Sequence, residues 1–151
     1  MDALEFSDRL RTVLSDARRQ ATHLRHEHIG TEHLLLALLT DSERDGNGPP
    51  SLVSAVFDML GVDRAKIRDV IEQTVLPGRA TATEDQVSYS SRAKAVLELA
   101  MAEARVSRAS TVDAQHLLLG LVREERGIAA QVLLDFGVTA DKARGELTRL
   151  A

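Results

Sequence analysis

Two stretches of this chain, Ile29-Gly30-Thr31-Glu32-His33-Leu34-Leu35-Leu36 and Val112-Asp113-Ala114-Gln115-His116-Leu117-Leu118-Leu119, are versions of one motif. A second repeated stretch precedes each motif and begins at Phe6 in the first case and at Tyr89 in the second. The spacing between stretch and motif is the same in both cases. A long period that occurs only twice indicates a duplicated structural unit rather than an open solenoid. A duplicated unit presents two related surfaces, so a binding site is expected in two copies, or in one working copy and one altered copy.

The repeated stretches carry the periodicity of helices. Apolar residues recur on one helical face over residues 6–21, and the same steps recur over residues 89–104. Ser7 and Ser90 are each placed to cap a first turn with a hydroxyl. Residues 31–39 and 113–122 are too apolar for surface helices, so each is expected to be the buried central helix of its unit. Third helices are expected over residues 51–60 and 128–136, and fourth helices over residues 63–75 and 139–150.

Glycine and proline mark the boundaries. Gly61 and Gly137 each stand where a glycine cap would end the third helix of a unit. Residues 77–88 contain Pro, Gly and Thr without periodicity, which is typical of a linker. The sequence therefore predicts a single all-α domain over residues 1–151, with repeat one at 1–76 and repeat two at 89–151. Repeat one is the longer, and its extra residues, within 41–50, are expected to form an exposed, mobile loop.

Composition limits the classes of function. Of the 151 residues, 44% are hydrophobic and 3% aromatic, and such aliphatic sequence favours helices. A net charge of −4 argues against nucleic-acid binding, which needs clustered Lys and Arg. The absence of cysteine excludes disulfides and thiolate chemistry. No apolar run approaches the ~20 residues of a membrane helix. Acidic residues rather than a signal peptide follow Met1, so a cytoplasmic protein is expected.

Motifs of catalysis are missing from the sequence. It has no Gly-x4-Gly-Lys-Ser/Thr loop for ATP hydrolysis and no nucleophile elbow, so we expect neither an enzyme nor a cofactor. The histidines at His23, His26, His28 and His33 leave one alternative open, a small helical metal-binding protein or enzyme. Their spacing is not His-Glu-x-x-His. Of the four, His33 alone has a counterpart in the second repeat, His116, which favours a structural hydrogen-bonding role over metal binding.

The order of these motifs resembles a known family. A Phe-Ser-x-Arg helix start, then Ile29-Gly30-Thr31-Glu32-His33-Leu34-Leu35, then a weaker second copy, is similar to the amino-terminal repeat domain of Clp-type AAA+ unfoldases, especially the Clp C branch. The stretches at residues 92–100 and 120–124 are also close to the second repeat of that family. The resemblance covers nearly the whole chain. It implies two four-helix repeats packed with pseudo-two-fold symmetry.

The resemblance also implies a function. In this family the domain sits on the ATPase ring and docks substrates and adaptor proteins, and in the Clp C branch it recognises phosphorylated arginine on proteins marked for degradation. The chain is therefore expected to be a non-catalytic protein-recognition module of the Clp protease system. It is either the amino-terminal domain of a longer unfoldase or a free-standing paralogue that acts as a decoy or regulator. Gln115 and the extra residues at 41–50 favour the free-standing version.

Site residues follow from the same resemblance. Glu32 would hold the guanidinium of phosphoarginine, while Ser7 and Arg9 would face its phosphate. A carboxylate matches a guanidinium with paired, charge-assisted hydrogen bonds, and an arginine beside a hydroxyl suits phosphate oxygens. The second copy has glutamine at the position of Glu32, so a guanidinium would lose its counter-charge there. We expect a weakened second site at Gln115, Ser90 and Arg92.

Members of this family also carry an apolar contact surface near the first residues of each repeat. By resemblance, Phe6, Tyr89 and Lys94 belong to that surface here. The family has an aromatic residue three positions before Phe6, where this chain has Ala3. Peptide ligands of this apolar surface are therefore expected to bind poorly.

Overall fold

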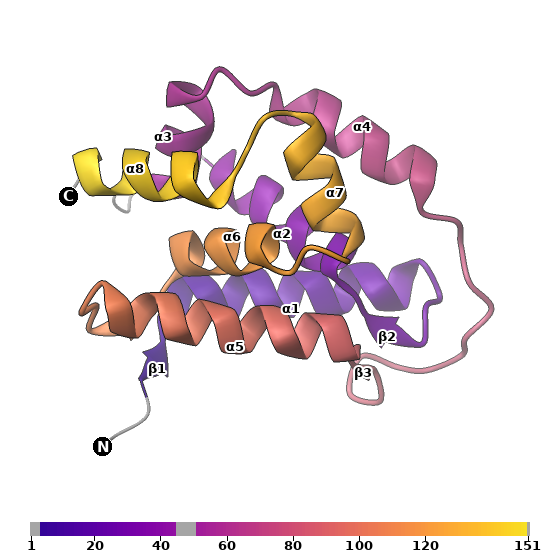
Figure 1. The fold of residues 1–151 in the computed structure, drawn as a ribbon. Helices are drawn as coiled ribbons and strands as arrows, with labels where there is room; N and C mark the ends of the chain where they lie inside the picture. Colours follow the sequence, from indigo (N-terminus) through magenta and orange to yellow (C-terminus); the bar gives the residue numbers. More distant parts are fainter. Residues whose placement is uncertain (1–3, 45–50, 151) are drawn as a thin grey trace.

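The computed structural model describes residues 4–44 and 51–150 of the chain. This part folds into eight helices and four two-residue strands (Figure 1). None of these described helices is long and apolar enough to cross a membrane. The helices are α1 (Asp8–His23), α2 (Thr31–Ser42), α3 (Leu52–Met59), α4 (Arg64–Thr74), α5 (Ser91–Val106), α6 (Ala114–Arg123), α7 (Ile128–Asp135) and α8 (Ala140–Leu150). The strands are β1 (Glu5–Phe6), β2 (His28–Ile29), β3 (Ser88–Tyr89) and β4 (Thr111–Val112).

The predicted all-α fold of two four-helix repeats is confirmed, with α1 to α4 in one repeat and α5 to α8 in the other. The Ser7 and Ser90 hydroxyls accept hydrogen bonds from the backbone N–H groups three residues further on, which confirms both as caps of α1 and α5. Gly61 and Gly137 follow α3 and α7 with φ angles of 67° and 82°. These left-handed conformations favour glycine and confirm the two predicted helix ends.

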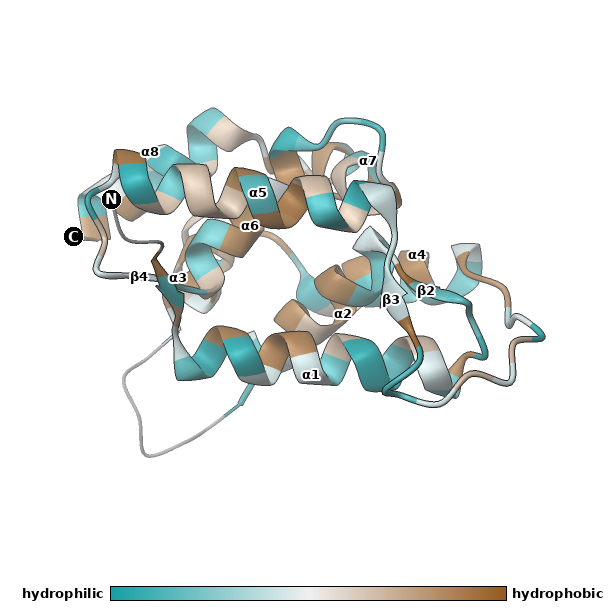
Figure 2. Ribbon diagram, turned by 90° about the horizontal axis from the view of Figure 1, so that it is seen from below, coloured by the Kyte–Doolittle hydropathy of each residue, from teal (hydrophilic) through white to brown (hydrophobic). Residues whose placement is uncertain are grey.

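The centre of the core is formed by the two central helices, α2 and α6. They contact each other, while α1 packs along α2 and α5 packs along α6. Figure 2 shows α2 and α6 lying between α1 and α5. Full burial of a leucine side chain contributes roughly 1.5–3 kcal/mol, so this central pair supplies a large share of the stability. Its fully buried leucines are Leu34, Leu35, Leu38, Leu39, Leu117, Leu118 and Leu121.

Two short parallel strand pairs join the repeats, each with one strand from either repeat. Strand β1 pairs with β4, in the register Phe6 to Val112, and β2 pairs with β3, in the register Ile29 to Tyr89. The pairs lie at opposite ends of α1 and α5 (Figure 1). Sequence analysis did not predict these strands. Because each strand leads directly into a helix, the start of α1 lies beside the start of α6, and the start of α5 lies beside the start of α2.

The first residues of the expected loop at 41–50 do not form a loop. Helix α2 continues to Ser42, and both Asp41 and Ser42 are buried, so the prediction of exposure is wrong at these two positions. The physical reason is local bonding, since the Ser42 hydroxyl donates to the Leu39 carbonyl and the Asp41 carboxylate pairs with Arg9. Residues 45–50 lie outside the described residues.

Candidate functional site

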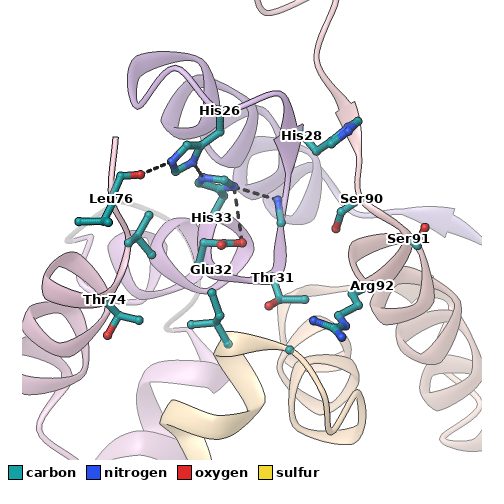
Figure 3. Close-up of a pocket in the computed structure, with 14 residues that line it drawn as sticks. His26, His28, Thr31, Glu32, His33, Thr74, Leu76, Ser90, Ser91 and Arg92 are labelled. Atoms are coloured by element: carbon teal, nitrogen blue, oxygen red, sulfur yellow. Dashed lines mark hydrogen bonds and ion pairs between the residues drawn. The ribbon is translucent and has the colours of Figure 1, made fainter. Parts of the chain in front are cut away.

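Helix α2 begins at the edge of a cavity of about 610 Å³. The walls come from the starts of α2, α5 and α7 and from the segment after α4 (Figure 3). Thr31 and Glu32 line it from α2, and Ser90 and Arg92 line it from the start of α5. The two repeats meet here because β2, which leads into α2, pairs with β3, which leads into α5.

This cavity groups the expected site residues in a new combination. The sequence predicts Glu32 beside Ser7 and Arg9, but the structure places Glu32 with Ser90 and Arg92. That predicted grouping is wrong because it assumes that each repeat builds its own site, whereas the strand pairs join the start of each outer helix to the central helix of the other repeat. Ser7 and Arg9 instead belong to the opposite end of the molecule, where α6 begins.

Within the described residues, Glu32 has no cationic partner. Its side chain is 17% exposed, and its ion-pair neighbour is the His33 imidazole, 3.9 Å away. Burial, aided by the nearby His26, lowers the pKa of His33 to about 4, so this imidazole is neutral at pH 7 and supplies no counter-charge. Gly30 leaves room for the Glu32 carboxylate to fold back over the start of α2, since a Cβ atom there would collide with it. A mostly buried carboxylate without a counter-ion favours a cationic ligand.

Arg92 brings the opposite charge to the same cavity. It is exposed in the first turn of α5, and its guanidinium forms no ion pair with any residue that the structure describes. Its side chain extends toward Thr31 (Figure 3). The Ser90 hydroxyl accepts the N–H of Ala93, which leaves its own proton available to a ligand. Two helix N-termini also converge here, and their free N–H groups favour an anion.

A chain of hydrogen bonds forms another wall of the cavity. The Gly30 N–H donates to His33 Nδ1 at 2.8 Å, His33 Nε2 lies 2.7 Å from His26 Nδ1, and His26 Nε2 lies 2.7 Å from the Leu76 carbonyl oxygen (Figure 3). The predicted structural role of His33 is thus confirmed. Sequence analysis missed the contribution of Leu76, and nothing in its local sequence points to it. The counterpart of His26 in repeat two is Ala109. This difference between the repeats was the one feature of the sequence that could have pointed to a role of His26 in repeat one.

The second copy of the site is occupied by a side chain of the protein itself. Asp113 stands where repeat one has Gly30, and its carboxylate accepts hydrogen bonds from the Ser7 hydroxyl at 2.7 Å and from the first N–H of α6 at 2.8 Å. Arg9 is engaged by Asp41 at 3.4 Å, and burial raises the pKa of Asp41 although Arg9 acts against that rise. A phosphate at this place would meet the Asp113 carboxylate.

Gln115 lines a different cavity, of about 460 Å³, next to His116. Much of its wall is apolar, and the carboxylate within it, Glu103, is already bound by Arg123 and Arg144 at 3.0 and 2.6 Å. The predicted grouping of Gln115 with Ser90 and Arg92 is wrong, because Ser90 and Arg92 line the cavity of Glu32 instead. That repeat two binds more weakly stays a prediction, and the Asp113 carboxylate beside Ser7 adds a second reason for it. The apolar walls come from Leu52, Val106, Ala109, Leu119 and Leu147.

The residues expected to form an apolar contact surface lie on the two strand pairs. Phe6 on β1 and Tyr89 on β3 are partly buried and pack against the core. The Arg18 guanidinium lies over the Tyr89 ring, 5.7 Å from its centroid. Lys94 is exposed on α5. A partner at either end would therefore reach only part of an aromatic ring.

The four histidines of the metal hypothesis do not converge on one point. His26 and His33 bond to each other, while His28 lies 3.4 Å from the Ser88 hydroxyl. His23 lines a separate depression between α1 and α2. Over residues 4–44 and 51–150, no group of three or more His, Cys, Asp or Glu is placed to hold a metal ion. The structure therefore lends this alternative no support.

Two four-helix repeats joined by crossed strand pairs, with a cavity where α2 and α5 begin, define a duplicated helical domain. The Clp repeat (R) N-terminal domain family matches residues 5–136 and, a second time, residues 88–151. The chain belongs to this family.

Similar proteins agree with this assignment. ClpC/MecB of Bacillus subtilis, described as a negative regulator of genetic competence, is 39% identical over 145 residues, which cover 96% of this chain and 17% of that protein. The chaperone ClpB of Oceanobacillus iheyensis is 37% identical over the same shares. The chain thus spans about 17% of the length of these relatives.

Solved structures of the family share the fold. The N-terminal domain of ClpD from Arabidopsis thaliana matches with a TM-score of 0.70 and 23% identity, covering 97% of this chain and 98% of that one. The N-terminal domain of Hsp104 from Candida albicans matches with a TM-score of 0.74 and 14% identity, covering 97% and 91%. At these identities the likeness establishes the architecture alone.

Proposed function

We propose that this chain is a non-catalytic recognition module of a cytoplasmic Clp unfoldase system, which binds protein substrates or adaptors and holds phosphoarginine in the cavity lined by Glu32, Ser90 and Arg92. The proposal rests on two opposite charges that line the same cavity although neither forms an ion pair with an oppositely charged side chain that the structure describes. Glu32 is mostly buried without a cationic partner, and Arg92 lies in the same cavity without an anionic one among the described residues.

The ligand's chemistry fits this arrangement. Phosphoarginine carries its phosphate directly on the guanidinium, so one small group presents N–H donors and phosphate oxygens side by side. The guanidinium would donate to the Glu32 carboxylate, and the phosphate would accept from Arg92 and from the Ser90 hydroxyl. The N–H groups at the starts of α2 and α5 would add favourable dipoles near the phosphate.

Calorimetric titration with free phosphoarginine at pH 7.5 tests the proposal. One site is expected, and Glu32→Gln or Arg92→Ala should weaken binding by roughly 10- to 150-fold, because each removes a charged hydrogen bond worth about 1.5–3 kcal/mol. Arg9→Ala is the matched control, since it removes the equivalent arginine of the other repeat and should change affinity less than about twofold. Free arginine and inorganic phosphate should each bind more weakly than the combined ligand. Undiminished binding by the Glu32→Gln protein would overturn the assignment.

A further inference from the structure

The hydrogen bonds between Gly30, His33, His26 and Leu76 can run in one direction only. A backbone N–H can only donate, so His33 Nδ1 must be an acceptor, and neutral His33 carries its proton on Nε2. That proton is donated to His26 Nδ1, so neutral His26 carries its proton on Nε2 and donates it to the Leu76 carbonyl, which can only accept. We call these two imidazoles and their three hydrogen bonds the histidine relay.

The histidine relay has no place for another proton. The two lone-pair nitrogens, Nδ1 of His33 and Nδ1 of His26, are both already acceptors. A proton added to His26 Nδ1 would point at the Nε2–H of His33. Moving the His33 proton to Nδ1 would in turn oppose the Gly30 N–H. Protonation therefore breaks at least one of the three bonds, and His26 is the accessible member because it is half-buried whereas His33 is buried.

The charges around His26 make the consequence specific. The neutral His33 of α2 contacts His26, and the Glu32 carboxylate lies 3.9 Å from His33. His28 of β2 and Arg92 of α5 line the same cavity. The remaining lining residues of this cavity, after α4 and at the start of α7, carry no charge, and the segment after α4 offers the Leu76 carbonyl. Arg25 and Glu27 flank His26 in its own loop, and Arg25 Nε donates to the Ala80 carbonyl. A positive His26 would thus compete with a cationic ligand for Glu32.

We propose that the histidine relay makes ligand binding in this cavity dependent on pH, with the ligand held while both imidazoles are neutral and released as His26 takes up a proton. The proposal rests on the proposed function. Two effects act together, since the added charge partly neutralises Glu32 and the broken bond separates His26 from His33 in the cavity wall. Protonation and binding oppose each other, so affinity falls as the pH falls. Repeat two has no such device, because His116 Nε2 faces the Ser107 hydroxyl at 3.4 Å instead of a second imidazole.

Binding of phosphoarginine at pH 7.5 and 5.5, compared between wild type and His26→Gln, tests this. Glutamine offers an uncharged acceptor and donor and takes up no proton. The phosphate of the ligand also titrates, so the quantity measured is the ratio of the two Kd values at each pH. That ratio should shift in favour of His26→Gln at pH 5.5, because in the wild-type protein a proton must leave His26 before the ligand binds. His23→Gln is the matched control, since His23 lines a separate depression outside this cavity, and it should behave as wild type. Equal pH dependence in wild type and His26→Gln would overturn the proposal.

A measurement on the free protein separates this proposal from the proposed function. Imidazole nitrogen NMR at pH 7.5 should find both His26 and His33 protonated on Nε2, and acidification should shift the Gly30 amide together with the His26 ring. A His26 ring protonated on Nδ1 at pH 7.5 would refute the relay itself. An intact relay with no phosphoarginine binding at pH 7.5 would refute the proposed function, and the proposed release with it. His26→Asn serves as a second uncharged variant if His26→Gln is poorly folded.

Discussion

The Ser7 hydroxyl donates a hydrogen bond to the Asp113 carboxylate at 2.7 Å, although 106 residues separate the two in the chain. The contact exists because β1 pairs with β4, which brings the cap of α1 against the cap of α6. Over the residues that the structure describes, the Ser90 hydroxyl donates to no carboxylate, and Gly30 occupies the position equivalent to Asp113. One substitution therefore separates an open cavity from a self-occupied one.

Opening the second site should create a second binding event. In Asp113→Gly combined with Gln115→Glu, the Ser7 hydroxyl becomes free and a guanidinium acceptor is restored. Calorimetric titration with phosphoarginine should change from one site to two, the new one weaker because Asp41 still holds Arg9. Glycine at a helix N-cap costs only a few tenths of a kcal/mol, so the fold should persist. Gln115→Glu alone should leave one site, and a single site in the double variant would contradict the prediction.

Gly120 should be indispensable for the close packing of α5 on α6. A Cβ atom there would lie 2.5 Å from the Val96 carbonyl oxygen and 3.2 Å from the Ala100 backbone nitrogen, neither of which can move without shifting α5. Gly120→Ala should lower the free energy of unfolding by about 1–3 kcal/mol in urea titration. Gly145, exposed in α8 with nothing within 4 Å of its Cβ position, is the control. Gly145→Ala should raise stability by about 0.5–1 kcal/mol, because alanine is the better helix former.

The buried Glu103 should contribute more to the free energy of unfolding than any exposed acidic residue on α5. Burial would raise its pKa, but hydrogen bonds and charge from Arg144 and Arg123 outweigh burial and hold the pKa below the usual value. Glu103→Gln leaves two arginines without their shared carboxylate and should cost about 2–4 kcal/mol in urea unfolding. Glu98→Gln, on the exposed face of the same helix, should change stability by less than about 0.5 kcal/mol. Equal effects of the two substitutions would show that the buried network contributes little.

Stability should fall on acidification because of His33. Its pKa in the folded protein is about 4, against about 6.5 for an unperturbed histidine, so between these limits the unfolded chain binds a proton that the folded chain does not. The contribution of neutral His33 to the free energy of unfolding is complete above pH 6.5. It is lost as the pH falls toward 4, a decrease of about 3 kcal/mol. Burial also lowers the pKa of His116, which adds a change of the same sign.

Urea unfolding at several pH values checks this. His33→Gln should show a shallower decrease in the free energy of unfolding between pH 6.5 and 4 than wild type. His23→Gln, at the exposed end of α1, should follow wild type. An unchanged slope in the His33→Gln protein would mean that the buried imidazole is not what destabilises the fold in acid.

The helices were predictable because their signals are local. The caps Ser7 and Ser90, the glycines Gly61 and Gly137, and the aliphatic runs of α2 and α6 act over three or four residues, and each appears in both repeats. The predicted boundaries were least accurate where side-chain bonding extended a helix, as at the end of α2. Resemblance of the motif order pointed to the family, which the family match establishes.

The grouping of the site was not predictable in this way. Strands of two residues are too short for an alternating pattern to reveal, so the pairing of β2 with β3 leaves no trace in the sequence. That pairing decides that Glu32 shares a cavity with Arg92 rather than with Arg9. Likewise, the bond from His26 to Leu76 depends on where the chain returns after α4, 50 residues later.

By itself, the sequence determined the duplication, the eight helices and the residue types available for binding, because these follow from short-range periodicity and capping. The tertiary structure alone decided which residues share a cavity, that Asp113 fills the second copy of the site, and that two histidines are linked in a fixed proton arrangement. The physical reason is that these contacts depend on where separate segments of the chain meet. Strand pairing brings Ser7 to Asp113 and places Glu32 in one cavity with Arg92, and the return of the chain after α4 brings Leu76 to His26.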